Sequence, residues 1–171
     1  MHRPLKVQFY TKFIKPEGAH DTAFLEILKD YYLNNSLHVD IRKGHGKDQS
    51  AIVQEAIDRI GDYDRRIVVM DQDKSQAEMA KADDLASKNH IAIIRNYPCV
   101  EGVLVKILEP NKSINGMSSH ELKVYFEKNY IPRTKRTNKD IYKSKFPKAL
   151  LDEARKRVPE LNNLIELFEE K

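Results

Sequence analysis

The chain is poor in cysteine, and this scarcity limits its chemistry. Cys99 is the only cysteine among 171 residues, which excludes an internal disulfide and a zinc site built from several cysteines. An isolated thiol is more often a small packing residue than a nucleophile, so we expect Cys99 to be buried. The low cysteine content also agrees with a reducing compartment, and we expect a cytoplasmic protein.

Long apolar runs are missing as well. No stretch of about eighteen apolar residues occurs, and the start of the chain lacks the apolar core of a signal peptide. We therefore expect a soluble protein that has no membrane partner. The length suits one domain with a sizeable core, together with an extension.

Several common site motifs are absent. The sequence contains no Gly-x-x-x-x-Gly-Lys-Ser/Thr, so a P-loop is excluded. The run from Gly44 to Gly46 lacks the third glycine of a dinucleotide fingerprint and follows the second predicted strand rather than the first. No His-Glu-x-x-His pairing supports transition-metal hydrolysis. A phospho-acceptor receiver domain would need an acidic pair after the first strand and a lysine on a fifth strand, and neither is evident.

What the sequence does contain is an alternation of strand and helix patterns. Strands are predicted at residues 5–10, 37–41, 67–70 and 90–94, and helices between them at residues 22–33, 49–60 and 75–88. Such alternation implies right-handed βαβ crossovers. The sequence therefore predicts an α/β, Rossmann-like fold with a mainly parallel four-stranded sheet flanked by helices.

The pattern becomes wholly helical after the fourth strand. Pro98 suits the first turn of a helix at residues 99–108. Ser118 and Glu121 form a predicted capping box, like Ser75 and Glu78 earlier in the chain. Further helices are expected at residues 122–130, 139–143, 147–157 and 159–170. We expect an α/β domain at residues 1–110 and a basic helical extension at residues 111–171 packed on it.

The third predicted strand ends in two acidic residues, Asp71 and Asp73. On a buried parallel strand, their side chains would lie on one side of the carboxyl end, where open α/β sheets bind ligands. Two neighbouring carboxylates repel each other unless a proton or a cation lies between them, and Mg²⁺ prefers such oxygen ligands. The alternative is a solvated turn, because Asp is common where strands end.

Basic residues gather between Ile131 and Arg157. They form a candidate phosphate-binding surface. Tyr130, Tyr142 and Phe146 lie among them and could stack on unpaired bases. The alternative is a charged, solvated helix face whose aromatic side chains point into the core. The candidate nucleic-acid-binding residues are Arg133, Lys135, Arg136, Lys139, Lys143 and Lys145.

The acidic residues also carry a resemblance. Glu17-Gly18 after the first strand, with Asp71-x-Asp73 after the third, resembles the Toprim (topoisomerase-primase) catalytic domain. The segment from Asn96 through Pro98-Cys99 to Glu101 narrows this to the RloB-like family of bacterial defence-associated Toprim proteins. The resemblance covers most of the chain, including an alanine- and arginine-containing helix near residues 154–157. The family's glutamate-glycine pair closely follows its strand, whereas residues 12–16 intervene here.

The resemblance implies roles for five acidic residues. Asp71 and Asp73 would be catalytic and would hold Mg²⁺ or Mn²⁺. Glu17 would be a general acid/base or a further metal ligand. Asp21 matches a second acidic position, usually a glutamate, in Toprim nucleases that bind two metals; its alternative role is the N-cap of the predicted helix. Glu101 matches the family's glutamate, although a glutamate in a first helical turn also complements the helix dipole.

The function implied is a Mg²⁺-dependent nuclease that cleaves DNA or RNA in a bacterial defence or abortive-infection system. The alternative is a non-catalytic or partner-dependent module that binds nucleic acid and needs another protein, such as an ATPase, to act. Strand passage and primer synthesis both require domains that this chain lacks.

Overall fold

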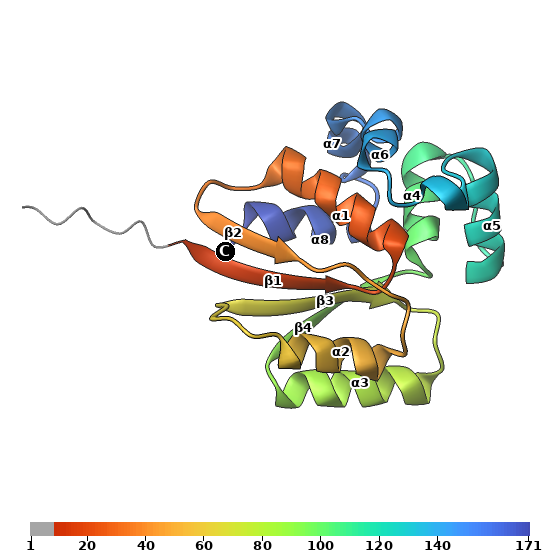
Figure 1. The fold of residues 1–171 in the computed structure, drawn as a ribbon. Helices are drawn as coiled ribbons and strands as arrows, with labels where there is room; N and C mark the ends of the chain where they lie inside the picture. Colours follow the sequence, from red (N-terminus) through yellow and green to blue (C-terminus); the bar gives the residue numbers. More distant parts are fainter. Residues whose placement is uncertain (1–8) are drawn as a thin grey trace, which may run out of the picture.

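The computed structural model describes residues 9–171 and contains a four-stranded, all-parallel sheet with helices on both faces (Figure 1). The predicted α/β, Rossmann-like class is confirmed. The order across the sheet is β2-β1-β3-β4. The strands are β1 (Tyr10–Pro16), β2 (Leu37–Ile41), β3 (Arg65–Asp71) and β4 (Ile91–Asn96).

Two helices cover one face of the sheet, and the other helices gather on the opposite face and at its edge (Figure 1). The first pair is α2 (Gln49–Asp58) and α3 (Gln76–Lys88). The others are α1 (Ala19–Tyr32), α4 (Val100–Leu108), α5 (Ser119–Asn129), the 3-10 turn η1 (Arg133–Lys135), α6 (Lys139–Lys145), α7 (Lys148–Ala154) and α8 (Pro159–Glu169). None of the helices within residues 9–171 combines the length and the apolar character needed to span a bilayer.

The first strand differs from its prediction. Residues 5–8 of the predicted strand lie outside the described residues, and β1 runs from Tyr10 to Pro16. Two lysines interrupt the apolar run, but both are buried with partners. Lys12 Nζ donates to the carbonyl of Leu167 at 2.9 Å, and Lys15 Nζ lies 2.6 Å from a carboxylate oxygen of Glu55. The strand therefore continues to the residue before Glu17.

The ends of the helices also refine the predictions. Ser118 and Glu121 form the complete predicted capping box at α5. At α3, the Ser75 hydroxyl accepts the Glu78 N–H at 3.2 Å, but the Glu78 carboxylate accepts the N–H of Gln49 instead of closing the box. Pro98 precedes the N-cap of α4, so its predicted place in the first helical turn is wrong.

The helical extension shares one apolar core with α1 and the sheet. Phe168 of α8 and Phe146 after α6 belong to the same buried cluster as Ile14 of β1 and Val39 of β2. A smaller cluster on the other face joins β1, β3 and β4 to α2 and α3. The larger core thus joins α1, α4 and the extension to one face of the sheet.

Candidate acidic site

The chain changes direction across the sheet between β1 and β3. After β1 it passes through α1 to β2 on one side, and then through α2 to β3 on the other side of β1. In open α/β sheets, ligands bind in the crevice at the carboxyl ends of the strands flanking such a switch point. Glu17 directly follows β1, and Asp71 is the last residue of β3. Residues 12–16 belong to β1 itself, so Glu17 follows its strand as closely as the family pattern requires.

Four of the five predicted acidic residues line one pocket of about 150 Å³, namely Glu17, Asp21, Asp71 and Glu101. Asp21 lies in the first turn of α1 and Glu101 in the first turn of α4. Asp73 is exposed and is not among the lining residues. Because β3 ends at Asp71, strand alternation does not extend to Asp73, although the charge of Asp73 contributes to the raised pKa of both Asp71 and Glu17.

Backbone N–H groups hold the two central carboxylates in place. The Asp71 N–H donates to Glu17 Oε2 at 2.8 Å, and the Val100 N–H donates to Asp71 Oδ1 at 2.9 Å. Val100 opens α4, so Asp71 lies at the positive end of that helix dipole. The Glu17 N–H donates to the carbonyl of Val69 at 2.9 Å, which continues the pairing of β1 with β3.

The pKa values of these acids are raised. Burial is the main cause for Asp71, whose pKa lies well above its usual range, and the charges of Asp21 and Glu17 raise it further. Burial and the charge of Glu101 raise the pKa of Asp21 in the same way. Burial also raises the pKa of Glu17, although the N–H of Asp71 opposes the shift. A proton or a cation in the pocket would relieve this excess of negative charge.

A residue at the end of β4 forms a hydrogen bond with Asp21. The N-cap of α1 is Gly18, so the interpretation of Asp21 as an N-cap is wrong. Asn96 at the end of β4 donates its Nδ2–H to Asp21 Oδ1 at 3.4 Å. Asn96 is 1% exposed, and its Oδ1 has no hydrogen-bond partner among the described residues. The site therefore contains a buried amide oxygen beside its carboxylates.

The donors at this site are carboxylate and amide oxygens. Within residues 9–171, no group of three or more His, Cys, Asp or Glu side chains is arranged to hold a metal ion. Mg²⁺ does not require such a group, because it keeps several water ligands and commonly uses one or two carboxylates. The donor set fits a hard, partly hydrated cation.

One residue that sequence reasoning missed supports Asp71 from the other face of the sheet. Gln49 is fully buried, and its Nε2 donates to the carbonyl of Asp71 at 2.7 Å. Arg95 donates to Gln49 Oε1 at 2.6 Å and also pairs with Asp83 at 2.6 Å. A glutamine in the first turn of a helix is ordinary, so the sequence contains no signal of this role.

A second missed feature is the loop after β2. A Cβ atom on Gly44 would lie 2.5 Å from the carbonyl carbon of Glu17, so only glycine fits there. The Gly46 N–H donates to the Glu17 carbonyl at 2.9 Å. Thr22 Oγ1 donates to the Gly18 carbonyl at 2.7 Å and accepts the Gly44 N–H at 3.0 Å. The glycine pair was visible in the sequence, but it shapes the turn at Glu17 rather than a dinucleotide site.

His20 joins the acidic pocket to the extension. Its buried ring lines the pocket, and Nδ1 shares a hydrogen bond with the hydroxyl of Tyr142 on α6. Nε2 lies 3.2 Å from Glu127 Oε1 on α5. Burial lowers the pKa of His20. These contacts hold α5 and α6 against the start of α1.

The aromatic residues of the basic segment mostly face inward. Tyr142 and Phe146 are fully buried, so the core interpretation is correct for both and base stacking on them is excluded. Tyr130 is partly buried and donates its hydroxyl to Glu109. Cys99 is fully buried, as expected for a packing residue.

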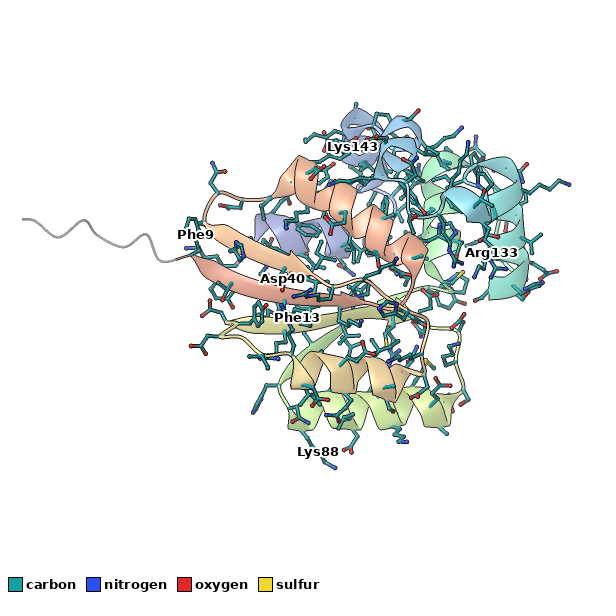
Figure 2. The ribbon with its side chains drawn as sticks, in the orientation of Figure 1. Phe9, Phe13, Asp40, Lys88, Arg133 and Lys143 are labelled. Carbon is teal, nitrogen blue, oxygen red and sulfur yellow. The ribbon has the colours of Figure 1, made fainter. Side chains whose placement is uncertain are left out.

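The basic side chains divide into paired and unpaired groups. Lys139 and Lys143 both pair with Asp30 of α1, at 2.8 Å and 2.6 Å. Arg136 lines the acidic pocket together with Lys123, which the sequence analysis did not single out. Figure 2 shows Lys143 and Arg133 in separate parts of the extension. The exposed residues of the predicted set are Arg133, Lys135 and Lys145.

Comparison with protein-family models, with curated proteins and with solved structures finds no match for this chain. The resemblance to RloB-like Toprim proteins therefore stays a hypothesis. It is carried by Glu17-Gly18, by Asp71-x-Asp73 and by residues 96–101.

Proposed function

We propose that this protein is a Mg²⁺- or Mn²⁺-dependent nuclease that hydrolyses phosphodiester bonds in DNA or RNA. The observation that carries the proposal is the meeting of Glu17, Asp21, Asp71 and Glu101 around one pocket at the switch point of the sheet. Perturbed carboxylates gathered in a pocket are typical of functional sites. The RloB-like resemblance adds the biological setting, a bacterial defence system.

Asp71 and Glu17 are the best placed of these residues to hold the ion. One oxygen of each accepts a backbone N–H, whereas Asp71 Oδ2 and Glu17 Oε1 accept no hydrogen bond from any residue within 9–171. Asp21 and Glu101 add negative charge behind them. A bound divalent ion supplies charge stabilisation for a phosphate oxygen and lowers the pKa of bound water.

The remaining steps belong to the chain itself. Glu17 would serve either as this ligand or as the general acid/base: without a bound ion its raised pKa suits a group that takes up and returns a proton during hydrolysis, whereas binding the ion would lower that pKa. Lys123 and Arg136 at the rim offset the charge of the acids and attract an incoming phosphate. Asp73, exposed beyond the end of β3, would contact substrate or solvent at the mouth of the site rather than its buried centre.

The test compares the wild type with Asp71→Asn. The asparagine keeps an oxygen for the Val100 N–H and removes the charge. Labelled single- and double-stranded DNA, transfer RNA and messenger RNA are incubated with and without Mg²⁺. We expect cleavage of at least one substrate by the wild type with Mg²⁺ and its loss in the variant. Asp84→Asn on the exposed face of α3 is the control, and equal cleavage by Asp71→Asn contradicts the proposal.

A partner-dependent module is the second candidate. The small volume of the acidic pocket, about 150 Å³, favours a site that another protein must open before substrate enters. Nucleic-acid binding by the wild type without cleavage in either Mg²⁺ or Mn²⁺ supports this candidate. Cleavage by the purified chain alone excludes it.

A further inference from the structure

The acidic pocket continues into a second hollow of about 330 Å³. The two share part of their lining, including Lys123 and Arg136, so they are neighbours along one surface. We call the second hollow the basic groove. Its lining residues are Gly18, Ala19, Lys43, Gly44, His45, Gly46, Lys123, Arg136 and Thr137.

The basic groove presents cations from three separate elements. Lys43 comes from the loop after β2, Lys123 from α5 and Arg136 from the segment after η1. No acidic side chain is among its described lining residues, and none of the three cations forms an ion pair within residues 9–171. Lys139 and Lys143, in contrast, both pair with Asp30, and Lys139 Nζ also lies 4.0 Å from a carboxylate oxygen of Glu26. The groove therefore presents three cations that form no ion pair with any described residue, beside the acidic pocket.

The walls of the groove are suited to phosphate rather than to bases. Gly18 and Gly46 bring backbone without a side chain to the wall of the groove, whereas Gly44 is buried behind them, and α1 begins at Ala19 at this end. His45 carries the only aromatic ring among the described lining residues, so the groove has no run of rings on which successive bases could stack. Contacts to phosphate position a nucleic acid without reading its sequence.

We propose that the basic groove binds the sugar-phosphate backbone of one nucleic-acid strand and sets an adjacent phosphate at the acidic pocket. A hollow of about 330 Å³ is too small to enclose a duplex, so a nucleic acid would contact it through one strand. The proposal rests on the proposed function for the identity of the substrate, but the binding itself requires no metal. The contact surface proposed here consists of Lys43, Lys123 and Arg136. Lys139 and Lys143, which the sequence analysis singled out, are not part of it.

The test measures binding by fluorescence anisotropy over a series of salt concentrations. The probes are labelled single-stranded DNA and RNA, each in two unrelated sequences, in EDTA, so that cleavage does not interfere. Lys123→Ala/Arg136→Ala is compared with Lys81→Ala/Lys128→Ala, which removes the same charge from α3 and α5 outside the groove. We expect the groove variant to reduce the salt slope by about 1.4, and to bind about 25-fold more weakly at about 0.1 M salt, because each single-strand phosphate contact contributes about 0.7. We expect the control variant to keep the wild-type slope.

Equal losses in the two variants overturn the proposal, because they show a response to net charge alone. A strong dependence of affinity on base sequence overturns the backbone-only contact. All the substituted side chains are at least partly exposed, and thermal melting verifies that both variants fold. Cleavage in Mg²⁺ is measured separately: binding by the wild type without cleavage contradicts the nuclease proposal and leaves the groove standing.

Discussion

Replacing Gly44 with alanine tests whether the loop after β2 holds the turn at Glu17. The new Cβ would lie 2.5 Å from the Glu17 carbonyl carbon, 2.6 Å from its oxygen and 2.6 Å from the Gly18 nitrogen. All three are backbone atoms, so no side-chain rotation relieves the clash. Gly44 is not among the residues with positive φ, so the alanine itself adds no left-handed strain. The loop and the turn must separate.

The expected cost follows from two terms. Overpacking costs about 1–3 kcal/mol, and loss of the hydrogen bond from Gly46 to Glu17 costs about 1 kcal/mol more. The sum is about 2–4 kcal/mol. A domain of this size loses roughly 2–4 °C of Tm per kcal/mol, so we expect Tm to fall by roughly 4–16 °C. Cleavage should fall as well, because Glu17 moves away from Asp71.

Scanning calorimetry measures the loss of Tm, and a cleavage assay measures the loss of activity. Gly116→Ala is the matched control: Gly116 has a φ of +82°, no atom lies within 4 Å of its Cβ position, and it does not line the acidic pocket. The control should lose about 1–2 kcal/mol through its left-handed backbone and keep full activity. A Gly44→Ala variant with the Tm and activity of the wild type would refute the idea that the loop after β2 holds the turn at Glu17.

Two further predictions concern buried charge. Because the folded pKa of Asp71 lies above its unfolded value, its contribution to the stability of the metal-free protein is present below pH of about 3.9 and is lost as pH rises through the folded pKa. Urea denaturation in EDTA should therefore show Asp71→Asn gaining stability over the wild type as pH rises from about 4, and a difference that does not change with pH contradicts this reasoning. Lys12→Met removes the donor to the carbonyls of Leu167 and Glu170, and we expect it to destabilise the fold by about 1–3 kcal/mol. Lys88→Met on the exposed side of α3 should be nearly neutral in the same assay, and an equal stability of the two lysine variants counts against a structural role for Lys12.

Most strands and helices could be predicted because their apolar periodicity is local. The strand Leu37–Ile41 has the predicted bounds, and Arg65–Asp71 differs by one or two residues at each end. The first strand could not be placed, because Lys12 and Lys15 look solvent-exposed in the sequence. Their partners lie far along the chain, so no local pattern reveals that they are buried.

The position of the acidic site followed from strand ends, but its composition did not. Asp21 enters the pocket because α1 begins at Ala19, and that start has no capping side chain to mark it. Asp73 stays outside because β3 ends at Asp71. The support from Gln49 depends on packing between α2 and the sheet, which sequence spacing does not encode.

In the basic segment, too, the sequence predicted the position of the residues but not their contacts. A cluster of lysines and arginines indicates where charge lies along the chain, but not which charges are neutralised. Lys139 and Lys143 both form ion pairs with Asp30 on α1. Arg136 joins Lys123 beside the acids only because the extension packs around the end of α1.

The closure of the sheet by its last helix has a consequence for folding. Lys12 of β1 bonds to Leu167 of α8 across 155 positions, and the Asn34 N–H donates to the Phe168 carbonyl at 2.8 Å. Closing so long a loop adds little to the free-energy cost, because that cost rises only with the logarithm of length, but contacts of this range slow folding. During synthesis, the part of the larger core that α8 completes stays exposed until α8 has emerged from the ribosome. That interval is when the nascent chain is most exposed to aggregation and to capture by chaperones.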